Sequence, residues 1–240
     1  MRSLAADKAP WDVQGAEKGE VVRSLFAAIA PSYDRLNAVL SLSRHHGWRD
    51  AAVAKLNLVP GATALDLCCG TGDFMRPLRR AVGPEGTVLG VDFCEPMLRL
   101  ALSKKQGFLA LGDAGSLPLA SGTVDAVTVG WGLRNVVDVD AVHREVVRVL
   151  KPGGRFASVD MSIPRSRAAR ASARLIIGNL VPVIGAMVGK RQAYAYVPKS
   201  TERFLDRDGL ARSMERAGLA QVVWKDFMFG NVCMHWGVKP

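Results

Sequence analysis

The sequence predicts an α/β fold in which helices cover both faces of a mostly parallel sheet. Three observations support this prediction. Short apolar runs alternate with stretches of helical periodicity between residues 65 and 162. The run VDAVTVGWGL is apolar almost throughout, which is typical of a strand buried on both faces. The run ALDLCCG ends in a glycine-rich turn, as strands of ligand-binding α/β folds do.

The elements can be assigned in chain order. Helical spacing of apolar residues, with Gly83 as a stop, predicts a helix over 73–83. Pro96 in a first turn indicates a second helix, over 95–107, and a third ends in the Pro-Gly-Gly turn at 152–154. The final part of the chain predicts a helix over 210–219 and then two antiparallel edge strands within 220–239. The five earlier strands are expected at 64–70, 86–93, 107–114, 124–133 and 155–162.

Two helical regions lie outside this alternation. We expect residues 1–20 to form a partly ordered N-terminal arm and residues 21–60 a helical cap. The sheet domain then covers 61–240 and includes an inserted helical lid at 163–200. The lid begins with the basic amphipathic stretch IPRSRAARASARLII and continues with LIIGNLVPVIGAMVG, which is shorter than the roughly 20 residues that span a membrane. Cap and lid are both expected over the carboxyl edge of the sheet.

Composition restricts the class of protein. With 49% hydrophobic residues the chain suits a soluble globular protein, and its net charge of +10 indicates an acidic partner, an anionic lipid surface or only a solvated basic surface. The four cysteines have no C-x-x-C spacing, so neither a zinc site nor a disulfide framework is expected. Free thiols favour a reducing cytosol. The N-terminus has no apolar run of signal-peptide length.

The glycine-rich turn predicts a ligand without phosphates. The dinucleotide fingerprint G-x-G-x-x-G is incomplete here, because Met75 replaces its third glycine. Asp73 at the start of the helix would repel a pyrophosphate. Gly70 and Gly72 still allow a close backbone approach. Asp92, at the end of the second strand, occupies the place of an acid that binds ribose hydroxyls.

A ligand with a ribose and no pyrophosphate is consistent with S-adenosylmethionine. Asp66 and Asp73 would suit its cationic groups, while Asp113 and the backbone of Ala114 would bind adenine. Each acid alone is more often a cap or turn residue, but their placement at successive strand ends favours a site. Cys68 and Cys69 are interpreted as small packing residues behind the turn.

Several motifs together resemble class I S-adenosylmethionine-dependent methyltransferases. They are LDLCCGTGD, VDF, GDAGSLP, VDAVTVGWGLRN and RVLKPGG. The stretch YDRLNAVLSLSRHHGW, with GLRN and AYAYVPKS, is more specifically similar to the C-methyltransferases of menaquinone and ubiquinone biosynthesis. The chain departs from that family's pattern at Asp160, at Gly130 with Trp131, and in a shortened segment between Lys104 and Gly112.

The resemblance implies a Rossmann-like class I methyltransferase fold with a mostly parallel seven-stranded sheet, the helical cap and the lid. It implies transfer of a methyl group from S-adenosylmethionine, without a metal, to a ring carbon of a prenylated quinol. The acceptor expected is demethylmenaquinol, in the last step of menaquinone biosynthesis, with a polyprenyl benzoquinol of ubiquinone biosynthesis as the alternative. The cofactor-binding residues expected are Asp66, Gly70, Thr71, Gly72, Asp92, Phe93, Asp113, Ala114, Gly130 and Trp131.

Four residues are candidates for the acceptor side. Arg134 and Asn135 would stabilise a developing phenolate, and His45 would accept a proton directly or through water. Tyr33, with Trp131 of the cofactor set, would face the sulfonium or the ring. Three of them have a structural alternative: an ion pair with an acid such as Asp34 or Asp92 for Arg134, a place on a helix surface or in the packing for His45, and core packing for Tyr33.

The lid is expected to form the wall of a channel for the prenyl tail, with its basic helix on anionic lipid headgroups. This predicts a cytoplasmic enzyme, peripheral to the inner membrane face, and leaves open whether it forms a homodimer. Three other functions stay open: a methyltransferase for a soluble small molecule, an RNA-binding protein, and a non-catalytic partner protein. The RNA interpretation lacks an aromatic-basic platform, so no nucleic-acid partner is expected.

Overall fold

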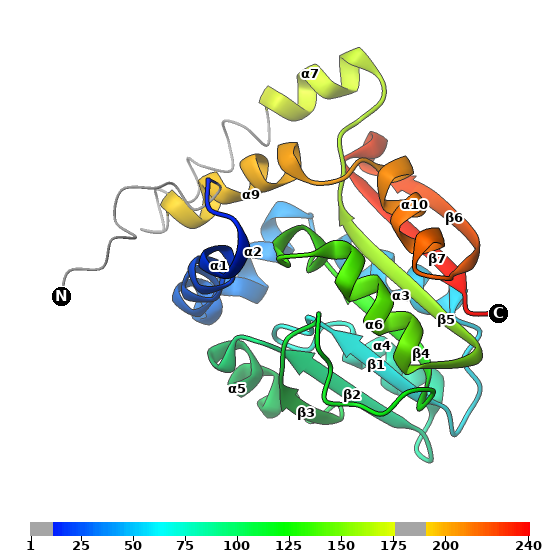
Figure 1. Ribbon diagram of the computed structural model, residues 1–240. Helices are drawn as coiled ribbons and strands as arrows, with labels where there is room; N and C mark the ends of the chain where they lie inside the picture. The colour runs from blue at the N-terminus through cyan, green and yellow to red at the C-terminus, as the bar shows by residue number, and fades with distance from the viewer. Residues whose placement is uncertain (1–11, 176–190) are drawn as a thin grey trace.

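The computed structural model describes residues 12–175 and 191–240, which form a seven-stranded sheet with helices on both faces (Figure 1). The order of the strands is β3-β2-β1-β4-β5-β7-β6. This confirms the predicted fold class. The strands are β1 (Thr63–Leu67), β2 (Thr87–Asp92), β3 (Phe108–Leu111), β4 (Val124–Gly130), β5 (Leu150–Met161), β6 (Ala220–Phe227) and β7 (Val232–Val238).

Strands β1 to β5 pair in parallel, whereas β7 is antiparallel to both β5 and β6. The expectation of two edge strands at the end of the chain is therefore wrong for β7. It lies between β5 and β6, with Arg155 paired to Val238 and Met161 paired to Val232. The pairing buries most of β7, including His235 and Met234, so of the two final strands β6 alone lies at an edge.

The two faces of the sheet have separate cores. Helices α3 (His45–Lys55), α4 (Met75–Val82) and α5 (Glu95–Lys104) contribute to one core, and α6 (Val139–Val149) and α10 (Arg207–Arg216) to the other. In Figure 1, α6 and α10 lie on the viewer's side of the sheet. Strand β1 serves both cores, because Ala64 belongs to the first and Leu65 to the second. Burial of an apolar side chain such as Val146 of α6 contributes about 1.5–3 kcal/mol.

A buried polar contact joins α6 to α10. His143 Nδ1 lies 2.7 Å from Ser213 Oγ, and this hydroxyl in turn donates to Asp140. Both His143 and Ser213 are fully buried. Burial lowers the pKa of His143 to about 4, so its ring is neutral at neutral pH.

The cap covers the carboxyl edge of the sheet. It consists of α1 (Gly15–Ile29), the short 3-10 helix η2 (Ala30–Ser32) and α2 (Tyr33–Leu40), and α1 thus begins within the stretch expected to be an arm. Ile29 and Ala30 pack against Cys94 and Met97 at the start of α5. Lys18 donates from Nζ to the carbonyl of Val136 at 2.6 Å, which holds α1 over the loop after β4.

Two helices of the predicted lid are described. The basic stretch forms α7 (Arg167–Leu175), and α9 (Arg191–Arg203) lies near the cap in Figure 1. The apolar run expected to line a channel falls mainly on residues 176–190, outside the described part of the chain. None of the helices described in 12–175 and 191–240 is long and apolar enough to cross a membrane.

Candidate active site

A pocket opens where the cap meets the carboxyl ends of β1, β2 and β4. Its lining combines residues of the sheet edge with residues of α1, α2 and the 3-10 helix η3 (Leu133–Asn135). Ligands of doubly wound sheets bind at this edge. Nine of the predicted site residues line the pocket: Tyr33, Gly70, Asp92, Phe93, Asp113, Ala114, Gly130, Trp131 and Asn135.

Asp92 is held at the pocket wall by the backbone. Its Oδ2 accepts from the N–H of Gly70, and its Oδ1 from the N–H of Cys94, both at 2.8 Å. Burial raises the pKa of this carboxyl group, and the backbone hydrogen bonds oppose the rise. A carboxylate oxygen has two acceptor positions, so each oxygen can still accept from a ligand hydroxyl.

The turns around the pocket require unusual backbone conformations. Cys68 after β1 and Trp131 after β4 both have φ 56°, although neither is glycine. Such conformations cost roughly 1–3 kcal/mol each and cluster at functional sites. Gly70 has φ 54° with open space around its missing Cβ, so a side chain there would stand in the pocket. At Gly130 a Cβ would lie 2.7 Å from the Phe74 ring.

The adjacent cysteines have different places. Cys69 is buried in the core beneath the turn, as expected of a packing residue, whereas Cys68 lines the pocket. Burial raises the pKa of both thiols well above the ordinary value, and nearby carboxylates add to this effect. Protonated thiols are poor nucleophiles, so neither cysteine is suited to covalent catalysis.

Three predicted cofactor residues, Asp66, Thr71 and Gly72, do not line the pocket. Asp66 accepts from Thr128 Oγ1 at 2.9 Å, and burial raises its pKa to about 8. A carboxyl group that is protonated at neutral pH does not offer a charge to a cationic ligand. The Thr71 hydroxyl donates to Asp34 Oδ1 at 2.5 Å, which connects the glycine-rich turn to the cap.

Asp73 is neutralised by neighbouring cations. Its carboxylate lies 2.9 Å from Lys104 Nζ and 3.4 Å from Arg49 Nη2. Burial alone would raise the pKa of Asp73, but Arg49 and Lys104 lower it below the ordinary value. Asp73 therefore does not meet the ligand as a free carboxylate, and the expectation that it suits the cationic groups is wrong.

Arg134 lies beside the pocket in a buried ion pair. Its Nη1 donates to Asp160 Oδ1 at 2.6 Å and to the carbonyl of Trp131 at 2.9 Å. An ion pair was the structural alternative expected for Arg134, and its partner is Asp160 rather than Asp34 or Asp92. Asp34 is instead 2.8 Å from Lys104. Arg134 itself is not part of the pocket lining, and its buried Nε has no hydrogen-bond partner among the described residues.

Asn135 and two tyrosines surround this guanidinium. Asn135 donates from Nδ2 to the carbonyl of Trp131 at 2.9 Å, and its buried Oδ1 has no partner among the described residues. Tyr33 lines the pocket, and Tyr196 of α9 is buried near Arg134 and Asp160. Burial raises the pKa of both phenols, so they remain protonated donors.

His45 is buried outside the pocket lining. Arg49 donates to its Nδ1, which therefore carries no proton and already accepts a hydrogen bond. Burial and the charge of Arg49 lower the pKa of His45 to about 4. The structure thus favours the packing alternative, with His45 as the partner of Arg49, over a role as proton acceptor.

Some of the lining could not be found from motifs. Phe26 and Gly19 reach the pocket from α1, and Val136 and Val137 follow the GLRN motif. Only the position of the two valines, directly after that motif, was a signal in the sequence. No group of three His, Cys, Asp or Glu side chains in the described part of the chain could hold a metal ion.

Comparison with known proteins decides the family. The ubiE/COQ5 methyltransferase family matches residues 13–239. The chain belongs to this family. A demethylmenaquinone methyltransferase of Bacillus cereus (strain B4264) is 40% identical over 230 residues, which cover 93% of this chain and 97% of the relative. A protein of the same name from Bacillus anthracis (strain CDC 684 / NRRL 3495) is 39% identical, with the same coverage.

Solved structures agree with this family at the level of the fold. A possible histamine N-methyltransferase of Thermotoga maritima superposes with a TM-score of 0.66 at 19% identity, over 91% of this chain and all of that one. A putative methyltransferase of Haloferax volcanii, solved with its Trm112 activator, gives 0.65 at 18% identity, over 90% of this chain and 97% of the other.

As a ubiE/COQ5 methyltransferase, the protein depends on S-adenosylmethionine. The pocket fits this cosubstrate: Asp92 presents acceptors for ribose hydroxyls, Asp113 and Ala114 stand at the next strand end, and Gly70 leaves room for close approach. When bound, the cosubstrate supplies an electrophilic methyl group.

Proposed function

We propose that the protein transfers a methyl group from S-adenosylmethionine to a ring carbon of demethylmenaquinol and so forms menaquinol. The observation that carries the proposal is the composition of the acceptor side. Arg134 and Asn135 supply polar groups, while Phe26, Val136 and Val137 supply apolar surface beside them. A prenylated quinol has the matching parts, a ring hydroxyl and an apolar tail. The name of the Bacillus relatives supports the same acceptor.

The chemistry needs a nucleophilic carbon in line with the methyl group, at ~3–3.5 Å. A ring carbon gains this character when a neighbouring hydroxyl becomes a phenolate. The positive charge of the Arg134 guanidinium, beside the pocket, stabilises the phenolate oxygen, and the ion pair with Asp160 holds the guanidinium in place. The new carbon–carbon bond forms as the bond between sulfur and methyl breaks, and loss of the ring proton restores aromaticity.

Tyr33 and Trp131 complete the site. Both line the pocket. The guanidinium carbon of Arg49 lies 4.6 Å from the centre of the Trp131 ring. We assign Tyr33 to the sulfonium or the quinol ring, as an aromatic face or an O–H donor. We assign Trp131 to the wall that keeps water away from the reacting carbon. His45 is not carried into this mechanism, because Arg49 occupies its Nδ1.

We also propose that the enzyme is cytoplasmic and acts at the inner face of the membrane, in which a quinol with a prenyl tail dissolves. The net charge of +10 and the basic helix α7 support contact with anionic headgroups.

Transfer of labelled methyl from S-adenosylmethionine tests the proposal. The purified protein is incubated in detergent, under reducing conditions, with demethylmenaquinol or with the demethylated benzoquinol precursor of ubiquinol. Label in the naphthoquinol alone supports the proposal, and label in the benzoquinol alone replaces the acceptor. Label in neither lipid, with cosubstrate binding intact by calorimetry, overturns the proposal and leaves soluble phenols to be tested.

A further inference from the structure

We infer that two exposed apolar turns, at Leu42 and Phe229, insert into an anionic lipid surface and orient the pocket toward the membrane. Among the large hydrophobic side chains that the structure describes, these two are the most exposed, at 76% for Leu42 and 92% for Phe229. The inference rests on the proposed function, because insertion would bring the pocket to an acceptor that dissolves in the membrane.

In both turns the exposed apolar residue has a backbone conformation that residues other than glycine rarely adopt. Leu42 and Ser43 have φ 50° and 58°, and Met228 and Phe229 have φ 47° and 57°. None of the four is glycine, so each turn contains two consecutive residues in the left-handed region. Backbone strain of this kind persists at functional sites. Glycine and small polar residues are the common choices in turns, so leucine and phenylalanine are unusual at these positions.

The two turns lie at the same edge of the sheet. Phe229 belongs to the 3-10 helix η5 (Met228–Gly230), which joins the end of β6 to the start of β7, at the carboxyl end of β5. Leu42 stands in the turn between α2 and α3. Trp48, in the first turn of α3, stacks on Phe227 with ring centroids 6.0 Å apart. This contact places the start of α3, which follows the Leu42 turn, beside the end of β6, which precedes the Phe229 turn.

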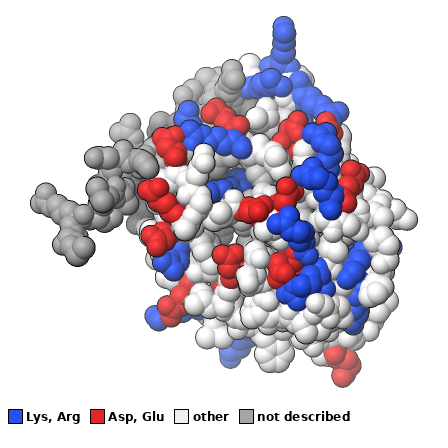
Figure 2. Space-filling view, viewed as in Figure 1, with Lys and Arg blue, Asp and Glu red and all other residues white. Residues whose placement is uncertain are grey.

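Basic residues surround the turns and complement anionic headgroups. The segment 161–175 contains four arginines and no acidic residue. Arg44 and Lys225, beside the two turns, are exposed, as are Arg167 and Arg170 of α7. Figure 2 shows Lys and Arg side chains at the top of the molecule, where α7 lies in Figure 1.

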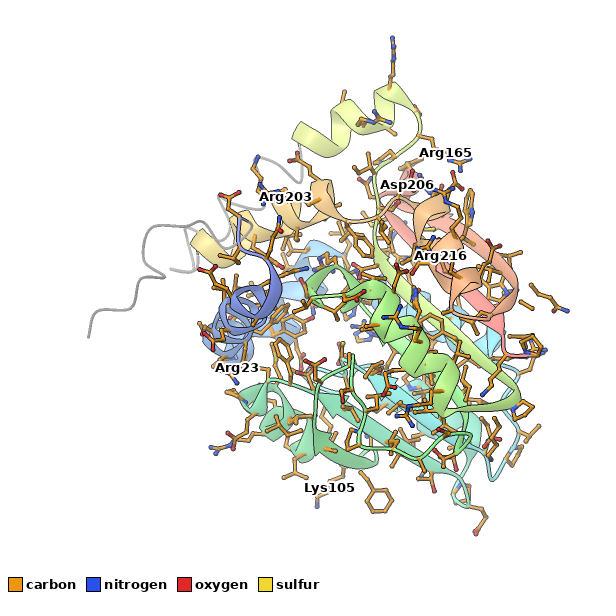
Figure 3. All side chains as sticks on the ribbon, viewed as in Figure 1. Arg23, Lys105, Arg165, Arg203, Asp206 and Arg216 are labelled. Atoms are coloured by element: carbon orange, nitrogen blue, oxygen red, sulfur yellow. The ribbon has the colours of Figure 1, made fainter. Side chains whose placement is uncertain are left out.

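Two acidic residues of this region, Asp208 and Asp226, are already paired with arginines. Asp208 accepts from Arg165 at 3.1 Å, and Asp226 accepts from Arg207 at 2.9 Å. Figure 3 places Arg165 in this upper region and Lys105 at the opposite end of the molecule. The apolar turns therefore project from a surface of positive charge, the combination that binds an anionic bilayer.

Flotation with vesicles tests the inference without any quinol or cosubstrate. Vesicles of phosphatidylcholine with phosphatidylglycerol are compared with vesicles of phosphatidylcholine alone. We expect the protein to bind the anionic vesicles, and Phe229→Ala to weaken binding about tenfold. Leu42→Ala should weaken it severalfold. The double variant Arg167→Glu/Arg170→Glu should lose the preference for phosphatidylglycerol.

Phe108 supplies the matched control. It is also an exposed phenylalanine, at 71%, but it begins β3 at the amino end of the parallel strands. Phe108→Ala should bind vesicles as the unchanged protein does. Because Phe229 and Phe108 are both exposed, their truncation leaves the fold intact, which equal thermal melting confirms.

Three outcomes overturn the inference. The first is that the unchanged protein fails to bind anionic vesicles, and the second is that Phe229→Ala binds these vesicles as tightly as the unchanged protein. The third outcome is that Phe108→Ala weakens binding as strongly as Phe229→Ala. If the turns instead join two copies, light scattering will show a dimer that Phe229→Ala dissociates, without vesicle binding. Failure of the proposed function is distinct from these results. Vesicle binding would then persist while methyl transfer to demethylmenaquinol in detergent is absent.

Discussion

The two walls of the pocket are held in place by different kinds of contact. On the sheet side, local turns fix the wall: Asp92 accepts two backbone N–H groups, and Gly70 adopts a left-handed conformation within a short stretch of chain. On the cap side, the wall depends on contacts between distant residues, such as Lys18 with the carbonyl of Val136 and Asp34 with Thr71. The difference indicates a fixed cosubstrate site and an acceptor wall that can be loosened separately.

The largest expected effect is the loss of stability in acid, because acid protonates a buried histidine on each side of the sheet when the chain unfolds. His45 and His143 have pKa values near 4 when folded, against 6.5 ordinarily. Between pH 6.5 and 4 the unfolded chain therefore binds more protons than the folded chain does. As the pH falls through this range, each histidine lowers the free energy of unfolding by about 1.4 kcal/mol per pH unit. Asp66, with its raised pKa, acts in the opposite direction.

Urea unfolding between neutral and acid pH measures this dependence. His143→Asn should reduce its slope by about 1.4 kcal/mol per pH unit, since the asparagine does not titrate. His45→Asn should reduce it equally if the helices before β1 unfold together with the sheet. A second transition in the His45 variant would show that this region unfolds separately, and unchanged slopes in both variants would contradict the assignment.

Replacement of Arg134 is expected to reduce turnover most among the site variants. Arg134→Ala removes the group assigned to the phenolate, and loss of one such donor costs about 100- to 1,000-fold in turnover. Binding of S-adenosylmethionine, measured by calorimetry, should remain. Methyl transfer under saturating cosubstrate is the readout.

The buried partner of Arg134 requires a control. Alone, Arg134→Ala leaves Asp160 as an unpaired buried carboxylate, which destabilises the fold. The double variant Arg134→Ala/Asp160→Asn should recover stability without recovering turnover. Normal turnover in either variant would refute the role given to Arg134.

Asp92 tests the sheet side of the comparison. Asp92→Ala removes the charged acceptor assigned to the ribose, and hydrogen bonds to charged groups contribute about 1.5–3 kcal/mol, or roughly 10- to 100-fold in affinity. Calorimetry with S-adenosylmethionine gives the change in Kd. Asp125→Ala is the matched control, because Asp125 binds Lys151 and the N–H of Thr63 at the other end of β4. Equal losses in both variants would exclude a specific contact at Asp92.

The sequence predicted the sheet side better than the cap side. The ends of β1, β2, β3 and β4 follow from apolar runs and local turn residues, so Gly70, Asp92, Asp113 and Gly130 were all expected in the wall where they lie. These positions depend on the order of parallel strands, which the alternation of strands and helices specifies. The place of β7 did not follow, because a hairpin at an edge and an inserted hairpin have the same sequence pattern.

Charges explain most of the remaining errors. Asp66, Asp73 and Asp92 are the same residue type at similar places in the sequence. Asp66 is protonated, and Asp73 is neutralised by Arg49 and Lys104. Of the three, Asp92 alone lines the pocket. Partners such as Asp160 for Arg134 come from strands far apart in the chain. Burial and long-range pairing decide these states, and no local pattern encodes them.

The contact of Asp34 with the sheet domain tests the cap side, and its effect is expected to be the smallest. Asp34 accepts from Thr71 at 2.5 Å and from Lys104 at 2.8 Å, but its side chain is 46% exposed, so the pair contributes about 0.2–1 kcal/mol. Asp34→Asn weakens the Lys104 contact and should loosen the cap. We expect a severalfold rise in KM for the quinol, with kcat and the Kd of S-adenosylmethionine unchanged, because only the acceptor wall moves.

Glu95→Gln is the matched control for Asp34→Asn, because it removes an exposed ion pair with Arg99 that joins residues of one helix. This variant should leave all three constants unchanged. If Asp34→Asn instead weakened S-adenosylmethionine as much as the quinol, the two walls would not be separable. Asp34 would then act through Thr71 on the glycine-rich turn, and the cap would have to be regarded as part of the cosubstrate site.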